Sequence, residues 1–264
     1  MRSDDTTSRA APQSSCAAGG ERLQNVLARR GVASRRHAAE WITAGAVTVN
    51  GQTVYEPGAR VQPEKDDIRV KGKSLPKQAE CLRTILLYKP RGLICSADNQ
   101  RGATVCDLMR PHFRERLVPV GRLDKESEGL LLMSNDGELT HCMTHPRYDH
   151  TKTYHARVAG RMEEGKIETL RSRLEIDGYV IQPVEVEVLK VGRDNTHLLS
   201  FTLAEGRNRQ IRKMCSLAHF VVLCLTRVRI AFLKIGDMRP GEWRELSDSE
   251  VRALKRPLLR TPDQ

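Results

Sequence analysis

Residues 117–137, Leu-Val-Pro-Val-Gly-Arg-Leu-Asp-Lys-Glu-Ser-Glu-Gly-Leu-Leu-Leu-Met-Ser-Asn-Asp-Gly, contain two apolar runs joined by a polar loop. The runs, Leu117–Val120 and Leu130–Met133, are short enough to form buried strands rather than helices. The loop begins and ends with glycine and carries Asp124 near its entrance. Catalytic residues often lie on loops held by rigid strands, but aspartate is also a common turn residue. Local physics therefore leaves a catalytic and a structural role open for Asp124.

The order of residues in this stretch is more specific than its aspartate. Gly-Arg-Leu-Asp, four further residues, Gly-Leu-Leu-Leu and then Asn-Asp-Gly resemble the catalytic motif of RNA pseudouridine synthases, most closely the RsuA type, which modifies single uridines in ribosomal RNA. The resemblance extends from about residue 21 to about residue 255. It implies cleavage of the bond between base and ribose, rotation of the base and reattachment through carbon-5. That isomerisation involves neither redox chemistry nor hydrolysis, so we expect no cofactor and no metal.

The bulk composition favours a polyanionic partner. The 264 residues carry a net charge of +11 and only 4% aromatic residues, so RNA binding would depend on Arg and Lys contacts to phosphate. Many basic proteins bind no RNA, and charge alone leaves that alternative open. No apolar run is long enough for a membrane span, and no Cys-x-x-Cys pair suggests zinc or a disulfide framework. A cytoplasmic protein is expected, and an organelle with its own ribosomes is also compatible.

The N-terminal part of the chain divides into a tail, a small domain and a linker. Residues 1–20 are expected to be a disordered tail, 21–70 a small RNA-binding domain, and 71–82 a charged linker. Leu23 begins a helical pattern, Ser34 is a good N-cap for a second helix, and Val-Thr-Val-Asn-Gly from residue 47 suggests a hairpin. These motifs resemble the RNA-binding domain of the fourth small-subunit ribosomal protein. Its candidate phosphate contacts, which could equally form a solvated face, are Arg22, Arg29, Arg30, Arg35 and Arg36.

The catalytic domain is expected at 83–256, followed by a tail at 257–264. Its strands lack a regular βαβ rhythm, which argues against a doubly wound sheet. The resemblance implies an α+β fold with a large mixed, mainly antiparallel sheet flanked by helices. Lys89 lies in a Lys-Pro-Arg-Gly turn, where it contacts RNA or is simply solvated. His141 and His145 are spaced for one helix face, but no motif supplies a third metal ligand.

Two further motifs complete the candidate site. Tyr154 would by default pack in a half-buried strand; in a Lys-x-Tyr motif, the resemblance makes it the aromatic that stacks on the target base. Gly-Arg-x-x-Gln-Ile-Arg ends in Arg212, which the resemblance pairs with Asp124. A small apolar residue is also expected beneath the site, and Leu225 is our candidate. The remaining candidate RNA contacts in this domain are Arg122, Lys152, Arg207 and Arg209.

The role of Asp124 stays open between attack on the ribose carbon and removal of its neighbouring proton, and both need an ionised carboxylate. An opposing guanidinium would favour that form. Arg122 could contact a phosphate or hold the loop. We expect a monomer that acts on ribosomal RNA or a ribosomal subunit precursor, and residues 124–129 and 240–246 favour large-subunit RNA. The alternatives are a non-catalytic RNA-binding or ribosome-assembly protein on this fold and a synthase that acts on transfer RNA.

Overall fold

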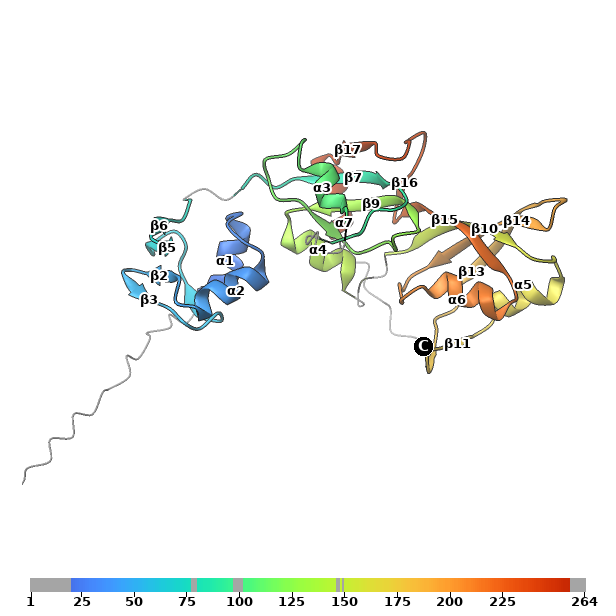
Figure 1. The fold of residues 1–264 in the computed structure, drawn as a ribbon, viewed down its shortest axis with the longest axis horizontal. Helices are drawn as coiled ribbons and strands as arrows, with labels where there is room; N and C mark the ends of the chain where they lie inside the picture. Colours follow the sequence, from blue (N-terminus) through green and yellow to red (C-terminus); the bar gives the residue numbers. More distant parts are fainter. Residues whose placement is uncertain (1–19, 77–79, 97–101, 146–147, 149, 257–264) are drawn as a thin grey trace, which may run out of the picture. The chain divides into compact units, whose positions relative to one another are not determined.

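The computed structural model describes residues 20–76, 80–96, 102–145, 148 and 150–256 (Figure 1). The tails expected at 1–20 and 257–264 lie outside these residues, apart from Gly20. The chain divides into two compact units, with the boundary in the sequence between Glu80 and Cys81. No helix among the described residues is long and apolar enough to cross a membrane.

The small unit packs two helices against short strands. Helices α1 (Leu23–Arg29) and α2 (Arg35–Thr43) bury one apolar face each, and the side chain of Ser34 accepts a hydrogen bond from the His37 amide, as its N-cap role predicts. One sheet pairs β1 (Glu21–Arg22) with β4 (Arg60–Val61). The other has the order β3-β2-β5-β6, with bounds Gln52–Thr53, Val47–Val49, Ile68–Val70 and Lys73–Ser74.

The predicted start of the linker, at residue 71, is wrong. Lys73–Ser74 forms strand β6, which pairs with β5 across a turn at Lys71 and Gly72, where both φ angles are positive. A charged segment can still satisfy the free backbone groups of an edge strand, and its composition does not reveal that pairing. Residues 77–79, within the expected linker, lie outside the described residues.

The large unit is built on one nine-stranded sheet. The strand order is β13-β14-β10-β15-β9-β7-β17, with β16 paired to β15 and β8 paired to β9. Only β9 and β15 run parallel, so the sheet is mixed and mainly antiparallel, which confirms the predicted α+β fold. The bounds are β7 Thr84–Lys89, β8 Val118–Val120, β9 Glu128–Ser134, β10 Lys152–Ala159, β13 Glu185–Val191, β14 Thr196–Leu203, β15 Val221–Ile230, β16 Leu233–Lys234 and β17 Trp243–Glu245.

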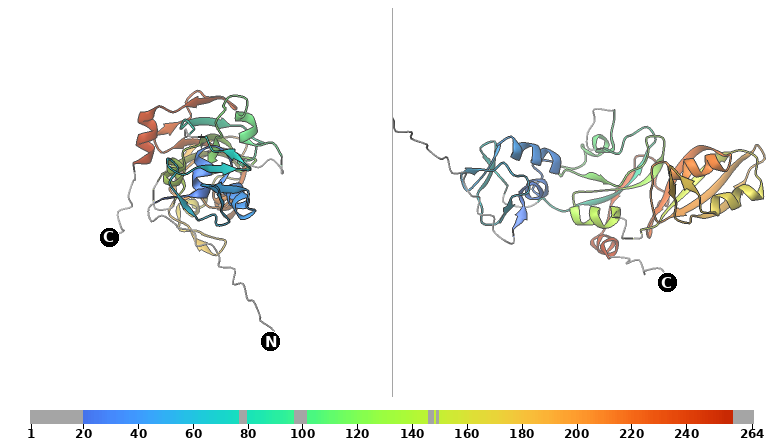
Figure 2. Two further views of the ribbon diagram at one scale, coloured as in Figure 1. Left: turned by 90° about the vertical axis from the view of Figure 1, so that its left-hand side faces the viewer. Right: turned by 90° about the horizontal axis from the view of Figure 1, so that it is seen from below.

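Both faces of β7 and β9 are covered, which explains why their sequences are continuously apolar. Leu86, Leu130 and Leu132 pack toward α4 (Gly137–Thr144) and α7 (Asp248–Lys255). The alternate residues, including Ile85 and Leu131, pack on the opposite side with α3 (Val105–Met109). Helices α4 and α7 lie side by side, as Figure 2 shows. A capping box of Ser247 and Glu250 begins α7.

The other half of the sheet is covered on one face by two helices. Helices α5 (Glu164–Arg171) and α6 (Gln210–Leu217) enclose a core with β10, β13, β14 and β15 (Figure 1). Helix α5 ends at Arg171, and Leu174 packs on this core from the segment that follows the helix. A hairpin of β11 (Glu175–Ile176) and β12 (Tyr179–Val180) follows and contacts α6.

The two halves of the sheet join where β9 meets β15. Gly129 lies opposite Arg227 in this parallel pair. A Cβ atom at Gly129 would lie 2.4 Å from the Arg227 carbonyl oxygen, and the φ of Gly129 is +102°. Only glycine allows this close approach. As a result, the loop before β9 lies against β10 and β15.

Candidate active site

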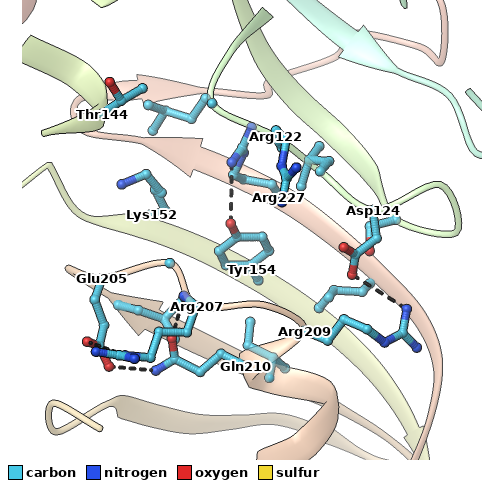
Figure 3. Close-up of a pocket in the computed structure, with 18 of the residues that line it drawn as sticks. Arg122, Asp124, Thr144, Lys152, Tyr154, Glu205, Arg207, Arg209, Gln210 and Arg227 are labelled. Carbon is cyan, nitrogen blue, oxygen red and sulfur yellow. Dashed lines mark hydrogen bonds and ion pairs between the residues drawn. The ribbon is translucent and has the colours of Figure 1, made fainter. Parts of the chain in front are cut away.

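A cavity of about 240 Å³ opens where the loop at residues 121–127 faces β10, β15 and the segment that precedes α6. It is lined by Asp124 and Tyr154, which the sequence analysis placed together (Figure 3). Of the other predicted contacts, the lining includes Arg122, Lys152, Arg207, Arg209 and Leu225. Arg212 is outside this lining, and so is Lys89.

Backbone hydrogen bonds hold the Asp124 loop in place. The Ser127 amide donates to the Asp124 carbonyl at 3.1 Å, which closes the loop on itself. The Gly92 amide donates to the Lys125 carbonyl at 2.8 Å, and the Leu123 amide donates to the Cys95 Sγ at 3.3 Å. The segment after β7 therefore supports the loop from outside the cavity.

Lys89 is part of this support, which corrects its predicted contact with RNA. Its side chain is fully buried, and Nζ donates to the carbonyls of Ser127 at 2.7 Å and Pro90 at 3.0 Å. Burial lowers the pKa of Lys89. The turn motif suggested an exposed lysine. In the fold, β9 pairs with β7 beside Lys89, and the loop that precedes β9 covers the lysine side chain.

Arg209 is the cation closest to the Asp124 carboxylate. Its Nη1 lies 3.8 Å from Asp124 Oδ2 and 3.4 Å from Glu126 Oε2. Arg209 immediately precedes α6 and has a left-handed backbone, with φ of 53°. The Asp124 side chain keeps 32% of its surface exposed, so a substrate can reach it.

The predicted pairing of Arg212 with Asp124 is not what the structure shows. Arg212 Nη1 donates to the Val222 carbonyl and Nη2 to the Ser127 hydroxyl, each at 3.4 Å. Arg212 lies within α6, whereas Arg209 lies at its start, where the left-handed turn precedes the helix. Arg212 thus holds the end of the loop, and Arg209 faces its carboxylates.

Tyr154 is held by a residue that the sequence analysis missed. Arg227 Nη1 donates to the Tyr154 hydroxyl at 3.3 Å, and the guanidinium carbon lies 5.9 Å from the ring centroid. Arg227 is 3% exposed, and its Nε donates to the Leu130 carbonyl at 2.6 Å. Because Arg227 pairs with Gly129 in the sheet, the same junction positions Tyr154 and the Asp124 loop. No local motif marks Arg227; only its place opposite Tyr154 on the neighbouring strand does.

Among the charged side chains that line the cavity, cations outnumber carboxylates. Arg207 lies between Glu205, 3.6 Å from its Nε, and the ring of Tyr179. The Gln210 side chain accepts from the Arg207 amide and donates to Glu205, which fixes the start of α6. Lys152 donates to the His150 carbonyl at 2.9 Å. Among the described residues, the cavity is lined by five cations, Arg122, Lys152, Arg207, Arg209 and Arg227, and by two carboxylates, Asp124 and Glu205.

Four of the five predicted phosphate contacts in the small unit are exposed: Arg22, Arg29, Arg35 and Arg36. Arg29 also donates to Glu21 at 2.7 Å. The prediction for Arg30 is wrong. Arg30 is 4% exposed and donates to the Pro76 carbonyl at 3.1 Å and to Glu64 at 2.9 Å. It ties the end of α1 to the segment after β6, which the sequence did not reveal.

His141 and His145 lie together at the end of α4, where the sequence raised a metal site as an alternative. The His141 and His145 rings are 4.9 Å apart between centroids, so they share a helix face as expected. In the part of the chain that the structure describes, no group of three or more His, Cys, Asp or Glu side chains could hold a metal ion.

Comparisons with known proteins agree with this geometry. Residues 83–217 match the family model described as RNA pseudouridylate synthase, and residues 21–68 match the S4 domain. The ribosomal large subunit pseudouridine synthase B of Bacillus subtilis is 37% identical over 236 residues, which cover 89% of this chain and 96% of that protein. An uncharacterised RNA pseudouridine synthase of Mycobacterium leprae is 40% identical and covers 90% of this chain, with 93% of its own length matched. A crystal structure of a pseudouridylate synthase matches with a TM-score of 0.63 at 27% identity and covers 88% of this chain and 99% of that one.

Proposed function

Because this chain belongs to the RNA pseudouridylate synthase family, we propose that it isomerises a specific uridine in large-subunit ribosomal RNA. The substrate proposal draws on the Bacillus subtilis relative, whose name specifies the large ribosomal subunit and whose length is almost wholly matched. The observation that carries the proposal is the presence of Asp124 and Tyr154 in one cationic cavity.

The cavity suits a single nucleotide taken out of its stack. Its volume of about 240 Å³ is smaller than the roughly 300 Å³ at which pockets for drug-sized ligands begin. Extruding a base costs a few kcal/mol, least at unpaired positions. The excess of cations along the wall offers phosphate contacts that can offset this cost. We therefore propose Arg122, Lys152, Arg207 and Arg209 as backbone contacts of the flipped uridine.

Asp124 is the proposed catalytic residue. Its carboxylate would act on the ribose carbon or on the neighbouring proton, and the Arg209 guanidinium lies 3.8 Å from it. Tyr154 would stack on the base, with its hydroxyl held by Arg227. Leu225 is 6% exposed and would form the apolar floor.

The small unit is the proposed second RNA contact. It matches the S4 domain, and Arg22, Arg35 and Arg36 are exposed. Arginines near a helix N-terminus suit phosphate binding. We also propose that the protein acts as a monomer in the cytoplasm, on ribosomal RNA or a subunit precursor.

The test is tritium release from large-subunit ribosomal RNA transcribed with uridine labelled at carbon-5. Wild type should release tritium, and Asp124→Asn should lose turnover by several orders of magnitude while still binding RNA. Asp237→Asn, which removes an exposed carboxylate outside the cavity lining, is the matched control and should behave as wild type. Normal turnover by Asp124→Asn would refute the assignment of the aspartate. Release only from transfer RNA would refute the substrate.

A further inference from the structure

A second cavity, of about 270 Å³, is lined by α3 and by the segment that leads from α3 to β8. Its lining includes Cys106, Arg110, Phe113, Arg114, Glu115 and Arg116, and it shares no described lining residue with the first cavity. Three arginines around one small cavity would repel one another unless anions lie nearby. The charges around this cavity therefore decide what it can bind.

The carboxylates at this cavity are already paired. Glu115 accepts from Arg83 Nε at 2.7 Å, and this hydrogen bond keeps the pKa of Glu115 below its usual range. Asp107 lies 2.9 Å from Arg110 and accepts from the Thr104 hydroxyl at the start of α3. Arg114 and Arg116 are exposed and have no ion-pair partner in the described part of the chain. Two positive charges are thus left for a ligand.

The cavity wall is fixed by packing. The Phe113 ring lies 4.8 Å from the Trp243 ring, between centroids, and the Arg83 guanidinium lies 5.9 Å from the Phe113 ring. The thiol of Cys106 donates to the Leu117 carbonyl at 3.6 Å. Burial raises the pKa of Cys106 to about 11, so the thiol stays neutral and adds no anion. The backbone that carries Arg114 and Arg116 is therefore anchored at Phe113 and Leu117, on either side of the two arginines.

This cavity is connected to the active site by one short strand. Leu117 lines it, and β8 leads from Leu117 to Gly121, which lines the catalytic cavity. Four steps along an extended chain span roughly 13 Å at about 3.3 Å per residue. A stacked nucleic acid strand advances about 3.4 Å per nucleotide. An RNA strand that leaves the active site could thus reach the second cavity within about four nucleotides.

We propose that Arg114 and Arg116 bind a backbone phosphate of the RNA strand that flanks the target uridine. This inference rests on the proposed function, because RNA is the polyanion that the neighbouring active site would hold. Guanidinium groups suit phosphate geometrically, and they remain charged at any physiological pH. The site would anchor the strand beside the extruded nucleotide, at a distance set by β8.

The experiment measures RNA affinity against salt concentration, with Asp124→Asn as the parent so that no turnover occurs. The double variant Arg114→Gln/Arg116→Gln is compared with the double variant Arg173→Gln/Arg193→Gln. The second variant is the control, because it replaces two exposed arginines of the same unit and removes the same charge. For single strands, the slope of log affinity against log salt falls by about 0.7 per phosphate contact. The Arg114/Arg116 variant should therefore lose about 0.7 from the slope on large-subunit ribosomal RNA, for the one phosphate that the two arginines would bind, and the control should lose much less.

Equal slopes for the two double variants would overturn the proposal, because net charge alone would then explain the effect. A photoreactive residue at position 114 gives a second readout that does not depend on affinity. Crosslinks within a few nucleotides of the modified uridine support the proposal, and crosslinks scattered along the RNA overturn it. Tritium release by wild type separates the two proposals: its absence refutes the function itself, whereas release with unchanged slopes refutes only the second site.

Discussion

Gly129→Ala tests whether the junction of β9 and β15 controls both stability and the active site. A Cβ atom at position 129 would lie 2.4 Å from the Arg227 carbonyl oxygen and 2.6 Å from the Arg227 amide nitrogen. These are backbone atoms in a sheet, so they cannot rotate away as a side chain could. Overpacking of this kind costs about 1–3 kcal/mol, and a backbone at φ +102° adds about 1–3 kcal/mol for a residue other than glycine. The expected loss is therefore about 2–6 kcal/mol.

Urea unfolding of the full chain measures this loss, and Gly137→Ala is the matched control. Gly137 begins α4, and a Cβ there would meet no atom within 4 Å. The control should therefore match wild type within about 0.5 kcal/mol, or exceed it slightly, because alanine favours a helix over glycine. Gly129→Ala should also lower turnover per folded molecule, since movement of Arg227 displaces the Tyr154 hydroxyl. If Gly129→Ala unfolds at the urea concentration of wild type, the close approach does not constrain the sheet, and the reasoning fails.

Three other changes separate structural from functional charges. Lys89→Met should cost about 1–3 kcal/mol of unfolding free energy, because it removes the donor to buried carbonyls. The control Lys125→Met, at an exposed lysine of the same loop, should be nearly neutral. Equal urea midpoints for the two variants would contradict this role of Lys89. Arg30→Ala should destabilise the small unit by about 1–3 kcal/mol yet leave the salt slope of RNA binding unchanged, and a shallower slope would restore Arg30 as a phosphate contact. The pKa of Glu250 is lowered to about 2 by Arg244, so this pair stabilises the fold above the ordinary carboxyl pKa of about 4.3 and stops doing so as the pH falls toward 2. Arg244→Gln should thus cost up to about 1 kcal/mol at neutral pH and much less at pH 2, and a loss that is the same at both pH values would contradict the pairing.

The features that the sequence predicted well depend on neighbouring residues. Ser34 caps a helix through the residue three positions away, and the glycine-bounded loop at Asp124 lies between two strands that its apolar flanks indicate. Each of these patterns is local, so one sequence contains all the required information. The resemblance to a known family supplied what local patterns could not, namely that Asp124 and Tyr154 share a site.

The features that could not be predicted from the sequence are buried lysine and arginine side chains whose hydrogen-bond partners lie far along the chain. Arg30 donates to Pro76, Lys89 to Ser127, and Arg227 to Leu130, over separations of 46, 38 and 97 residues. A lysine or arginine is exposed by default, and its burial depends on which distant carbonyl the fold places above it. Arg209, rather than the predicted Arg212, lies beside Asp124 for a similar reason. Which arginine faces the loop depends on where α6 begins, and α6 begins directly after the left-handed residue Arg209.

This sorting of cations changes what the net charge of +11 implies. Arg30, Lys89 and Arg227 each donate to a backbone carbonyl from a buried position, so they hold loops and strands in place. Two of the three support the active site directly, since Lys89 fixes the end of the Asp124 loop and Arg227 holds Tyr154. Part of the charge that makes the chain basic therefore shapes the site rather than binding RNA. A salt slope measured for the whole protein should accordingly be smaller than a count of its exposed and buried arginines and lysines would predict.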